Sequence, residues 1–188
     1  MPLLWLAQKQ NGNFLTLSAM QKIAKILEIP DMAVYETASF YTMYNRTSVG
    51  KFHLQICGTT PCMVKGAGPV IESALKHLNT TKNHVTPDGL FCVSEVECLG
   101  ACSNAPMMQV NNEWFYEDLT AESIVDVIEK FRNGEEVTPG PQTPLRKNCE
   151  GPEGRTTLKD FESVPISRDF AAAKKTWEEA KVKVNPPK

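Results

Sequence analysis

The chain has 188 residues, of which 41% are hydrophobic, so it is long enough to bury a core and suits one domain with appendages. Its 20 basic and 22 acidic residues give a net charge of −2, which provides no electrostatic footprint for nucleic acid or for an anionic membrane. No apolar run approaches the roughly 20 residues of a transmembrane helix, so we expect no direct membrane insertion.

Residues 1–46 have the pattern of a small helical bundle. A first helix over residues 3–7 is expected to break at Asn11-Gly12, and Ser18 with Gln21 predicts a capping box at the start of a second helix. A third helix is expected to begin at Asp31, after Pro30 has ended the second. The positions expected to face inward are Met20, Ile23, Ala24 and Leu27 in the second helix, and Val34, Tyr35 and Ala38 in the third.

Residues 47–134 have the pattern of an α/β domain. From Lys51 the apolar period changes to two, which predicts a strand that leads directly to Cys57. A helix over residues 70–78, a strand over 90–97, a hairpin of 107–110 and 113–117 around Asn111-Asn112, and a helix from Thr120 to Gly134 follow. This β-α-β-β-α order predicts an α/β layer fold.

Residues 135–188 are rich in proline and glycine, which predicts an extended tail without a core element. A short helix over residues 168–181 is expected within it, with Phe170, Ala173 and Trp177 on one face.

Four cysteines in two spaced pairs, Cys57 with Cys62 and Cys98 with Cys102, are the strongest signal in the sequence. Four thiolates are what a 2Fe-2S cluster requires from a protein, and each pair follows a predicted strand. A structural zinc site is an open alternative, although zinc ligands usually lie two to four residues apart. Disulfides and buried free thiols are further alternatives that spacing alone does not remove.

Other motifs have ordinary interpretations. Cys92 falls in a predicted strand as a small buried thiol, and Cys149 lies in the tail, so neither is expected to be a ligand. Gly66-Ala67-Gly68 lacks the third glycine of a dinucleotide fingerprint. The three histidines, at positions 53, 77 and 84, are expected to have surface or local structural roles, and the carboxylates at 95 and 97 to form a solvated or hydrogen-bonded strand face.

The residues around the cysteines resemble those of one family, the small thioredoxin-like iron–sulfur (24 kDa) subunits of respiratory complex I. The resemblance runs through Pro2-Leu3-Leu4, Ala38-Ser39-Phe40-Tyr41-Thr42-Met43-Tyr44, the Cys57 loop, Glu95-Val96-Glu97-Cys98-Leu99-Gly100-Ala101-Cys102, Asn104-Ala105-Pro106 and Tyr116-Glu117-Asp118-Leu119-Thr120. It implies a thioredoxin-like 2Fe-2S ferredoxin domain, preceded by the helical bundle and followed by the tail.

The resemblance also implies a function. Cys57, Cys62, Cys98 and Cys102 are expected to ligate one 2Fe-2S cluster, while FMN and NADH belong to a partner flavoprotein subunit with which the cluster exchanges single electrons. Further partners are expected among neighbouring peripheral-arm subunits, on the matrix side of the mitochondrial inner membrane. The mitochondrial location rests on the resemblance, because the first residues lack an Arg-rich presequence pattern. The alternative function is a stand-alone thioredoxin-like ferredoxin or a structural zinc-binding protein.

Hydroxyl groups near the cysteines are expected to tune the cluster. Thr59, Thr60 and Ser103 are candidates for hydrogen bonds to sulfur, which raise the reduction potential because reduction adds negative charge. Replacement of Thr60 by valine is expected to lower the potential if the Thr60 hydroxyl points at the cluster, and an unchanged redox titration would rule that contact out.

Overall fold

The computed structural model describes residues 1–144 and Lys174, and the helix expected over residues 168–181 lies outside the described residues apart from that lysine. The elements follow one another as α1 (Pro2–Gln10), α2 (Leu17–Leu27), α3 (Asp31–Phe40), β1 (Phe52–Cys57), α4 (Thr60–Val64), α5 (Ala67–Leu78), β2 (Phe91–Val96), η1 (Cys102–Asn104), β3 (Met108–Val110), β4 (Trp114–Glu117), α6 (Ala121–Asn133) and β5 (Gly140–Pro141).

The strands form one mixed sheet in the order β2-β1-β3-β4-β5. β1 runs parallel to β2, and the antiparallel partner on its other side is β3. β3 and β4 form the expected hairpin, and both turn residues adopt positive φ, Asn111 at 54° and Asn112 at 56°. Positive φ at both turn positions matches the right-handed twist of the flanking strands, which explains the choice of asparagine. The α/β layer fold is therefore confirmed.

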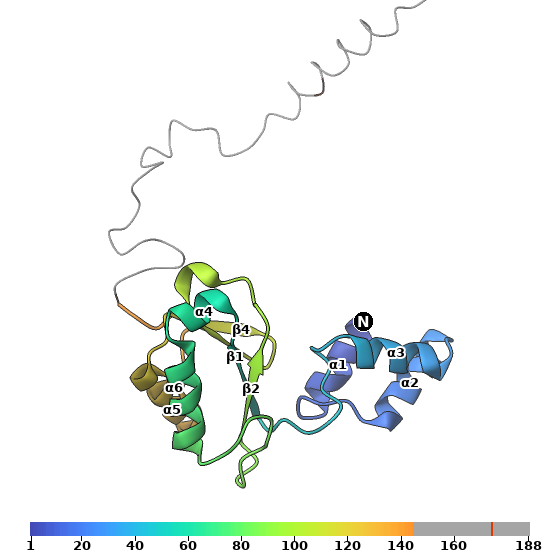
Figure 1. Cartoon of the computed structure of the whole chain (residues 1–188). Coiled ribbons are helices and arrows are strands. Elements are labelled where there is room, and N and C mark those ends of the chain that lie inside the picture. Colours follow the sequence, from blue (N-terminus) through green and yellow to red (C-terminus); the bar gives the residue numbers. More distant parts are fainter. Residues whose placement is uncertain (145–173, 175–188) are drawn as a thin grey trace, which may run out of the picture. The chain divides into compact units, whose positions relative to one another are not determined.

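One face of the sheet carries the core. Leu54 and Ile56 of β1 and Val93 of β2 are fully buried and pack with apolar side chains of α5 and α6. These two helices lie side by side against the sheet (Figure 1). Because strand side chains alternate, the intervening residues His53 and Gln55 point to the opposite face, which is therefore polar although buried.

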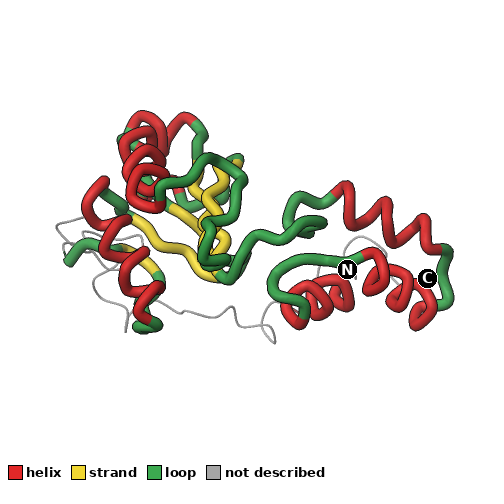
Figure 2. The backbone as a smooth tube through the Cα atoms, turned by 90° about the horizontal axis from the view of Figure 1, so that it is seen from below, coloured by secondary structure: helices red, strands yellow, loops and turns green. Residues whose placement is uncertain are grey.

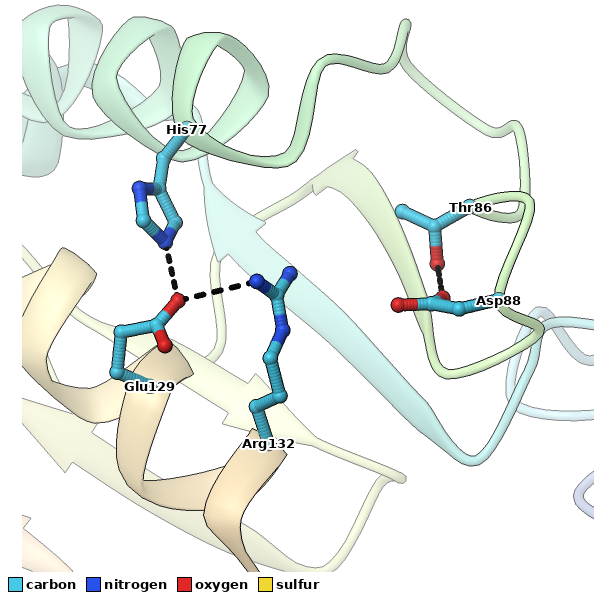
Figure 3. Close-up of polar contacts among 5 residues, drawn as sticks. All are labelled: His77, Thr86, Asp88, Glu129 and Arg132. Atoms are coloured by element: carbon cyan, nitrogen blue, oxygen red, sulfur yellow. Dashed lines mark hydrogen bonds and ion pairs between the residues drawn. The ribbon is translucent and has the colours of Figure 1, made fainter.

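A polar contact joins α5 and α6 at their exposed side. His77 Nε2 lies 2.6 Å from Glu129 Oε1, and Arg132 Nη1 lies 3.3 Å from the same oxygen (Figure 3). The turn before β2 is held by Asp88, which accepts a hydrogen bond from the Thr86 hydroxyl (Figure 3) and another, at 2.9 Å, from the Leu90 N–H. These donors hold the pKa of the Asp88 carboxyl below its ordinary value.

The helices α1, α2 and α3 form a group with a core of their own, the group that carries the N-terminus in Figure 2. Two details differ from the sequence prediction. The N-cap of α2 is Thr16, whose hydroxyl accepts from the Ala19 N–H at 3.2 Å, so Ser18 lies inside the helix. Leu27 is 46% exposed, because α2 ends there and the chain turns at Glu28 into the left-handed conformation.

The segment after α6 contributes more to the domain than its composition predicts. Val137 is buried against the main core, and Gly140–Pro141 pairs with β4 as the parallel edge strand β5. The expectation of a tail without core elements is therefore wrong for residues 137–141. Proline is compatible with such a strand because an edge position leaves one side of the backbone unpaired.

Candidate metal centre

The first cysteine pair lies where β1 passes into α4. Cys57 is the last residue of β1, and Cys62 lies inside α4, with each side chain only 1% exposed. Pro61 suits the first turn of α4 because that turn leaves a backbone N–H without a helical acceptor in any case. Ala67 and Met107 complete a small buried cluster around the two sulfurs. This pair is thus held rigidly in the protein interior.

The second pair lies after β2, with Cys98 in the loop that follows the strand and Cys102 at the first position of η1. Cys98 and Cys102 are both exposed, and their Sγ atoms are 3.5 Å apart. A disulfide requires about 2.05 Å, whereas two thiolates that share one tetrahedral metal at about 2.3 Å lie about 3.8 Å apart. The separation is therefore too long for a covalent bond, and it lies close to the separation of two ligands of one metal.

The topology of the sheet brings the two pairs together. β1 and β2 are parallel neighbours, with Cys57 opposite Val96. The cysteines that follow the two strands therefore lie at the same end of the sheet, beyond the carboxyl ends of its strands. The Gly58 N–H donates to the Val96 carbonyl at 3.0 Å, which ties the first ligand loop to the end of β2, two residues before Cys98. The expectation that each pair lies at a strand end is confirmed.

Hydrogen-bond donors point toward the sulfurs from several segments. The Thr59 hydroxyl lies 3.1 Å from Cys57 Sγ, and it also lowers the pKa of Cys98, so it acts on both pairs. Backbone N–H groups add to it: those of Thr59 and Leu99 lower the pKa of Cys57, and that of Met107 opposes the rise in the pKa of Cys62. Such donors stabilise negative charge on sulfur.

Within each pair, one thiol is shifted toward the thiolate and the other away from it. Burial raises the pKa of Cys57, but hydrogen bonds from Thr59, Cys62 and the Leu99 backbone outweigh burial and leave that pKa below its ordinary value. Burial, the hydrogen bond to Cys57 and the charge of Cys57 raise the pKa of Cys62 to about 11. Each thiolate is thus stabilised by its neighbour's proton.

The exposed pair shows the same division. The Gly100 backbone N–H, followed by the Cys102 thiol and the Thr59 hydroxyl, lowers the pKa of Cys98. The hydrogen bond to Cys98, followed by desolvation and the charges of Cys98 and Cys57, raises the pKa of Cys102. Because these interactions cross between the loops, the four sulfurs form one electrostatic unit.

A glutamate packs directly on the first ligand loop. A Cβ built on Gly58 lies 2.3 Å from Glu95 Oε1, so any larger residue at this position would have to displace the Glu95 side chain. Glu95 also forms an ion pair with Lys82, and both side chains are partly exposed. The predicted solvated, hydrogen-bonded strand face is confirmed at this residue.

The donor set fits a two-iron cluster. In the described part of the chain, no three cysteine, histidine or carboxylate side chains converge closely enough to hold a single metal ion. The four thiols come together instead as two pairs, and a 2Fe-2S cluster takes two protein ligands on each iron. The backbone donors around them supply the hydrogen bonds that such a cluster's sulfurs accept.

The remaining predicted residues fall outside this set or differ in detail. Cys92 is buried in β2 and is not among the groups that interact with the four sulfurs, while Cys149 lies outside the described residues. Of the two adjacent threonines, Thr59 contacts sulfur, whereas Thr60 is exposed at the start of α4. Sequence reasoning missed the backbone donors Leu99 and Met107, because a backbone N–H leaves no residue-type signal.

The histidines have the local roles that were expected, with one surprise. His77 pairs with Glu129, and the ring of His84 lies 3.0 Å from the Thr81 hydroxyl. His53 is 6% exposed rather than at the surface, and its Nε2 lies 2.8 Å from the Ser94 hydroxyl oxygen.

None of the helices in the described part has the length and apolar character required to cross a membrane.

Comparisons with known proteins agree with this site. Residues 1–132 match the family model described as thioredoxin-like 2Fe-2S ferredoxin. The chain is 49% identical over 168 residues to NADH dehydrogenase (ubiquinone) flavoprotein 2, mitochondrial, of Dictyostelium discoideum, covering 89% of this chain and 67% of that protein. It is 47% identical over 133 residues to a subunit of the NADH-quinone oxidoreductase of Rickettsia bellii, covering 71% of this chain and 79% of that one.

Among solved structures, an NAD⁺-reducing NiFe-hydrogenase in the air-oxidised state matches with a TM-score of 0.60 and 21% identity. The match covers 70% of this chain but only 23% of the hydrogenase chain. At this level of identity the likeness concerns the fold alone.

Proposed function

The chain belongs to the thioredoxin-like 2Fe-2S ferredoxin family, together with its relatives among the NADH dehydrogenase subunits of Dictyostelium and Rickettsia, and from this premise we propose that Cys57, Cys62, Cys98 and Cys102 bind one 2Fe-2S cluster. The observation that carries the proposal is the meeting of the two cysteine pairs at one end of the sheet. Inward N–H donors and an Sγ–Sγ separation of 3.5 Å in the exposed pair support it.

The surroundings suit one-electron transfer. When bound, a cluster of this type accepts and returns single electrons. The Thr59 hydroxyl and the N–H groups of Leu99 and Met107 offset negative charge on the sulfurs, which favours the reduced state. Cys57 and Cys62 fix the site in the interior, while Cys98 and Cys102 leave one side open for an electron to enter or leave.

We propose further that the chain acts as an electron-transfer subunit of NADH:ubiquinone oxidoreductase. Its partner would be a subunit that binds FMN and NADH, so hydride chemistry would take place on the partner and single electrons would pass to this chain. The names of the two relatives support this assignment. By the same resemblance, the location would be the matrix side of the mitochondrial inner membrane, as a peripheral subunit with neighbours in the same arm.

An exposed apolar patch supports a partner beside the cluster site. Val64 is 80% exposed and Met63 is 48% exposed, and both lie in α4 immediately after Cys62. Exposed apolar groups next to a redox site suit an interface that excludes water between two electron carriers.

The first test is the cluster content of anaerobically purified protein. We expect about two irons and two acid-labile sulfides per chain, and a rhombic paramagnetic resonance signal after reduction with dithionite. Cys98→Ala should lose all three, whereas the matched control Cys92→Ala should keep them, because Cys92 lies apart from the four sulfurs. Stoichiometric zinc without a reduced-state signal would overturn the proposal in favour of a structural metal protein.

The second test concerns the partner. Mixed with the FMN- and NADH-binding subunit, the cluster-loaded chain should form a complex in which NADH reduces the cluster. Val64→Glu should weaken that complex, whereas Lys76→Glu, which places a glutamate at an exposed position of α5 and makes an even larger change in charge, should not. A loaded chain that stays monomeric and is not reduced would support a stand-alone ferredoxin instead.

A further inference from the structure

A cavity of about 520 Å³ lies on the polar face of the sheet, away from the four proposed ligands. Its walls come from the segment before β1, which contributes Arg46, Thr47 and Ser48, and from the loop before β2, which contributes Asn83. His53 of β1 and Ser94 of β2 line it from the sheet. Pockets that bind small molecules have volumes of about 300–1,000 Å³, so this cavity is large enough for one.

The lining is rich in hydrogen-bond donors and has no acidic residue. Arg46 is exposed and takes part in no ion pair within the described part of the chain. The backbone N–H groups of residues 46–49 donate no hydrogen bond within the same part. The guanidinium, the two hydroxyls and these N–H groups are all donors of the kind that oxyanions accept.

A buried histidine adds a donor or acceptor that the fold itself does not use. His53 is 6% exposed, and its Nδ1 is buried without a hydrogen-bond partner in the described part of the chain. The other ring nitrogen is engaged with Ser94, which also lines the cavity. An unpaired polar atom in the interior costs about 1–3 kcal/mol, so its retention points to a use. Burial lowers the pKa of His53 to about 4, so the ring is neutral at physiological pH.

We propose that this cavity binds a small phosphorylated molecule, with the phosphoryl group held by Arg46 and the Thr47–Ser48 segment and the remainder directed toward His53 and Ser94. Arginine forms paired hydrogen bonds with phosphate oxygens, and hydroxyl and backbone donors complete the shell. The space beyond the cationic end exceeds that of inorganic phosphate alone, which favours a phosphate ester. The site is independent of the proposed cluster, because none of its four ligands lines the cavity.

The test is a calorimetric titration of the full, cluster-loaded chain at constant ionic strength with glycerol 3-phosphate, inorganic phosphate, glycerol and citrate. We expect saturable binding of glycerol 3-phosphate, weaker binding of inorganic phosphate, and no binding of glycerol. Citrate should bind more weakly than glycerol 3-phosphate. Arg46→Gln should weaken binding about tenfold or more, since it removes a charge-assisted contact. Arg132→Gln serves as the matched control, because Arg132 pairs with Glu129 on α6.

Several results would overturn the proposal. These are absence of saturable binding to the unaltered chain, equal weakening by Arg46→Gln and Arg132→Gln, equal binding of glycerol, and tighter binding of citrate than of glycerol 3-phosphate. Ser48→Ala gives a second variant at an exposed position that is not expected to affect folding, and it should weaken glycerol 3-phosphate binding severalfold. Iron content is the internal control, and it should remain unchanged in every variant.

Discussion

The two cysteine pairs occupy opposite environments although they belong to one site. Cys57 and Cys62 are 1% exposed and packed with Ala67 and Met107, whereas Cys98 and Cys102 are exposed to solvent. In both pairs, however, one thiol has a lowered pKa and the other a raised one. Burial therefore sets the rigidity and accessibility of a pair, while local hydrogen bonds set the sharing of a proton within it.

The largest expected difference comes from removing one ligand of each pair. Cys62→Ala and Cys102→Ala should both lose the cluster completely, because each leaves an iron without its full set of ligands. In the metal-free chains, Cys62→Ala should lower the free energy of unfolding by about 1 kcal/mol through lost packing. Cys102→Ala should change it by less than about 0.5 kcal/mol. Iron and sulfide analysis, with urea unfolding of the metal-free forms, measures both effects.

If Cys62→Ala and Cys102→Ala lowered the free energy of unfolding equally, the tighter packing of the buried pair would not contribute to stability. If either variant retained a full cluster, the assignment of that cysteine as a ligand would be wrong.

Alkylation of the metal-free chain tests the same contrast through reactivity. The thiolate is the reactive form, so Cys98, which is exposed and has a lowered pKa, should react first. Its rate should stay high as pH falls until pH passes below that lowered pKa. Cys62 is buried and has a pKa of about 11, so it should react at least about 100-fold more slowly than Cys98. Mass spectrometry of timed samples at several pH values gives the order.

In denaturant the four cysteines should react at similar rates, which provides the control. Faster labelling of Cys62 than of Cys98 under native conditions would contradict the assigned environments.

Sequence patterns predicted those parts of the molecule in which one residue type carries the information. The period-two run before Cys57 predicts β1, Thr120 and Gly134 predict the ends of α6, and Asn111-Asn112 predicts the hairpin turn. Each signal is local, because a cap or a positive φ depends on one or two side chains.

The errors arose where neighbouring residues offer equivalent chemistry or where partners are distant in sequence. Thr16 and Ser18 both have hydroxyls suited to capping, and only the helix start distinguishes them. β5 forms because Tyr116 and Glu117 of β4 offer their backbone as a pairing partner to Gly140 and Pro141. No pattern within residues 137–141 reveals that partner. The burial of His53 and the donors Leu99 and Met107 likewise depend on long-range packing.

The glycines of the two ligand loops are expected to be required for different reasons. Gly100 has φ of +83° with open space around its Cβ position, so Gly100→Ala should cost about 1–2 kcal/mol through backbone strain. Gly58→Ala should cost about 1 kcal/mol because the new methyl group displaces Glu95 and breaks its pair with Lys82. Chemical unfolding of the single variants, and of each combined with Glu95→Ala, measures the difference.

Glu95→Ala should restore stability to Gly58→Ala but not to Gly100→Ala. Equal rescue of both glycine variants would show that the two loops are not constrained as the contacts indicate.

The smallest expected effect concerns Thr59, the residue whose hydroxyl acts on both pairs. This hydroxyl lies 3.1 Å from Cys57 Sγ and lowers the pKa of Cys98. Thr59→Val should therefore lower the reduction potential, since the reduced cluster loses a donor that stabilises its added negative charge. A hydrogen bond contributes about 1 kcal/mol, which for one electron sets an upper limit of roughly 40 mV. Thr60→Val is the matched control, because Thr60 is exposed one residue further along. A redox titration followed by paramagnetic resonance measures both potentials. If Thr60→Val shifted the potential as much as Thr59→Val, the effect would come from the general polarity of the loop. The Thr59 hydroxyl, which acts on both the buried and the exposed pair, would then have no specific role in tuning the potential.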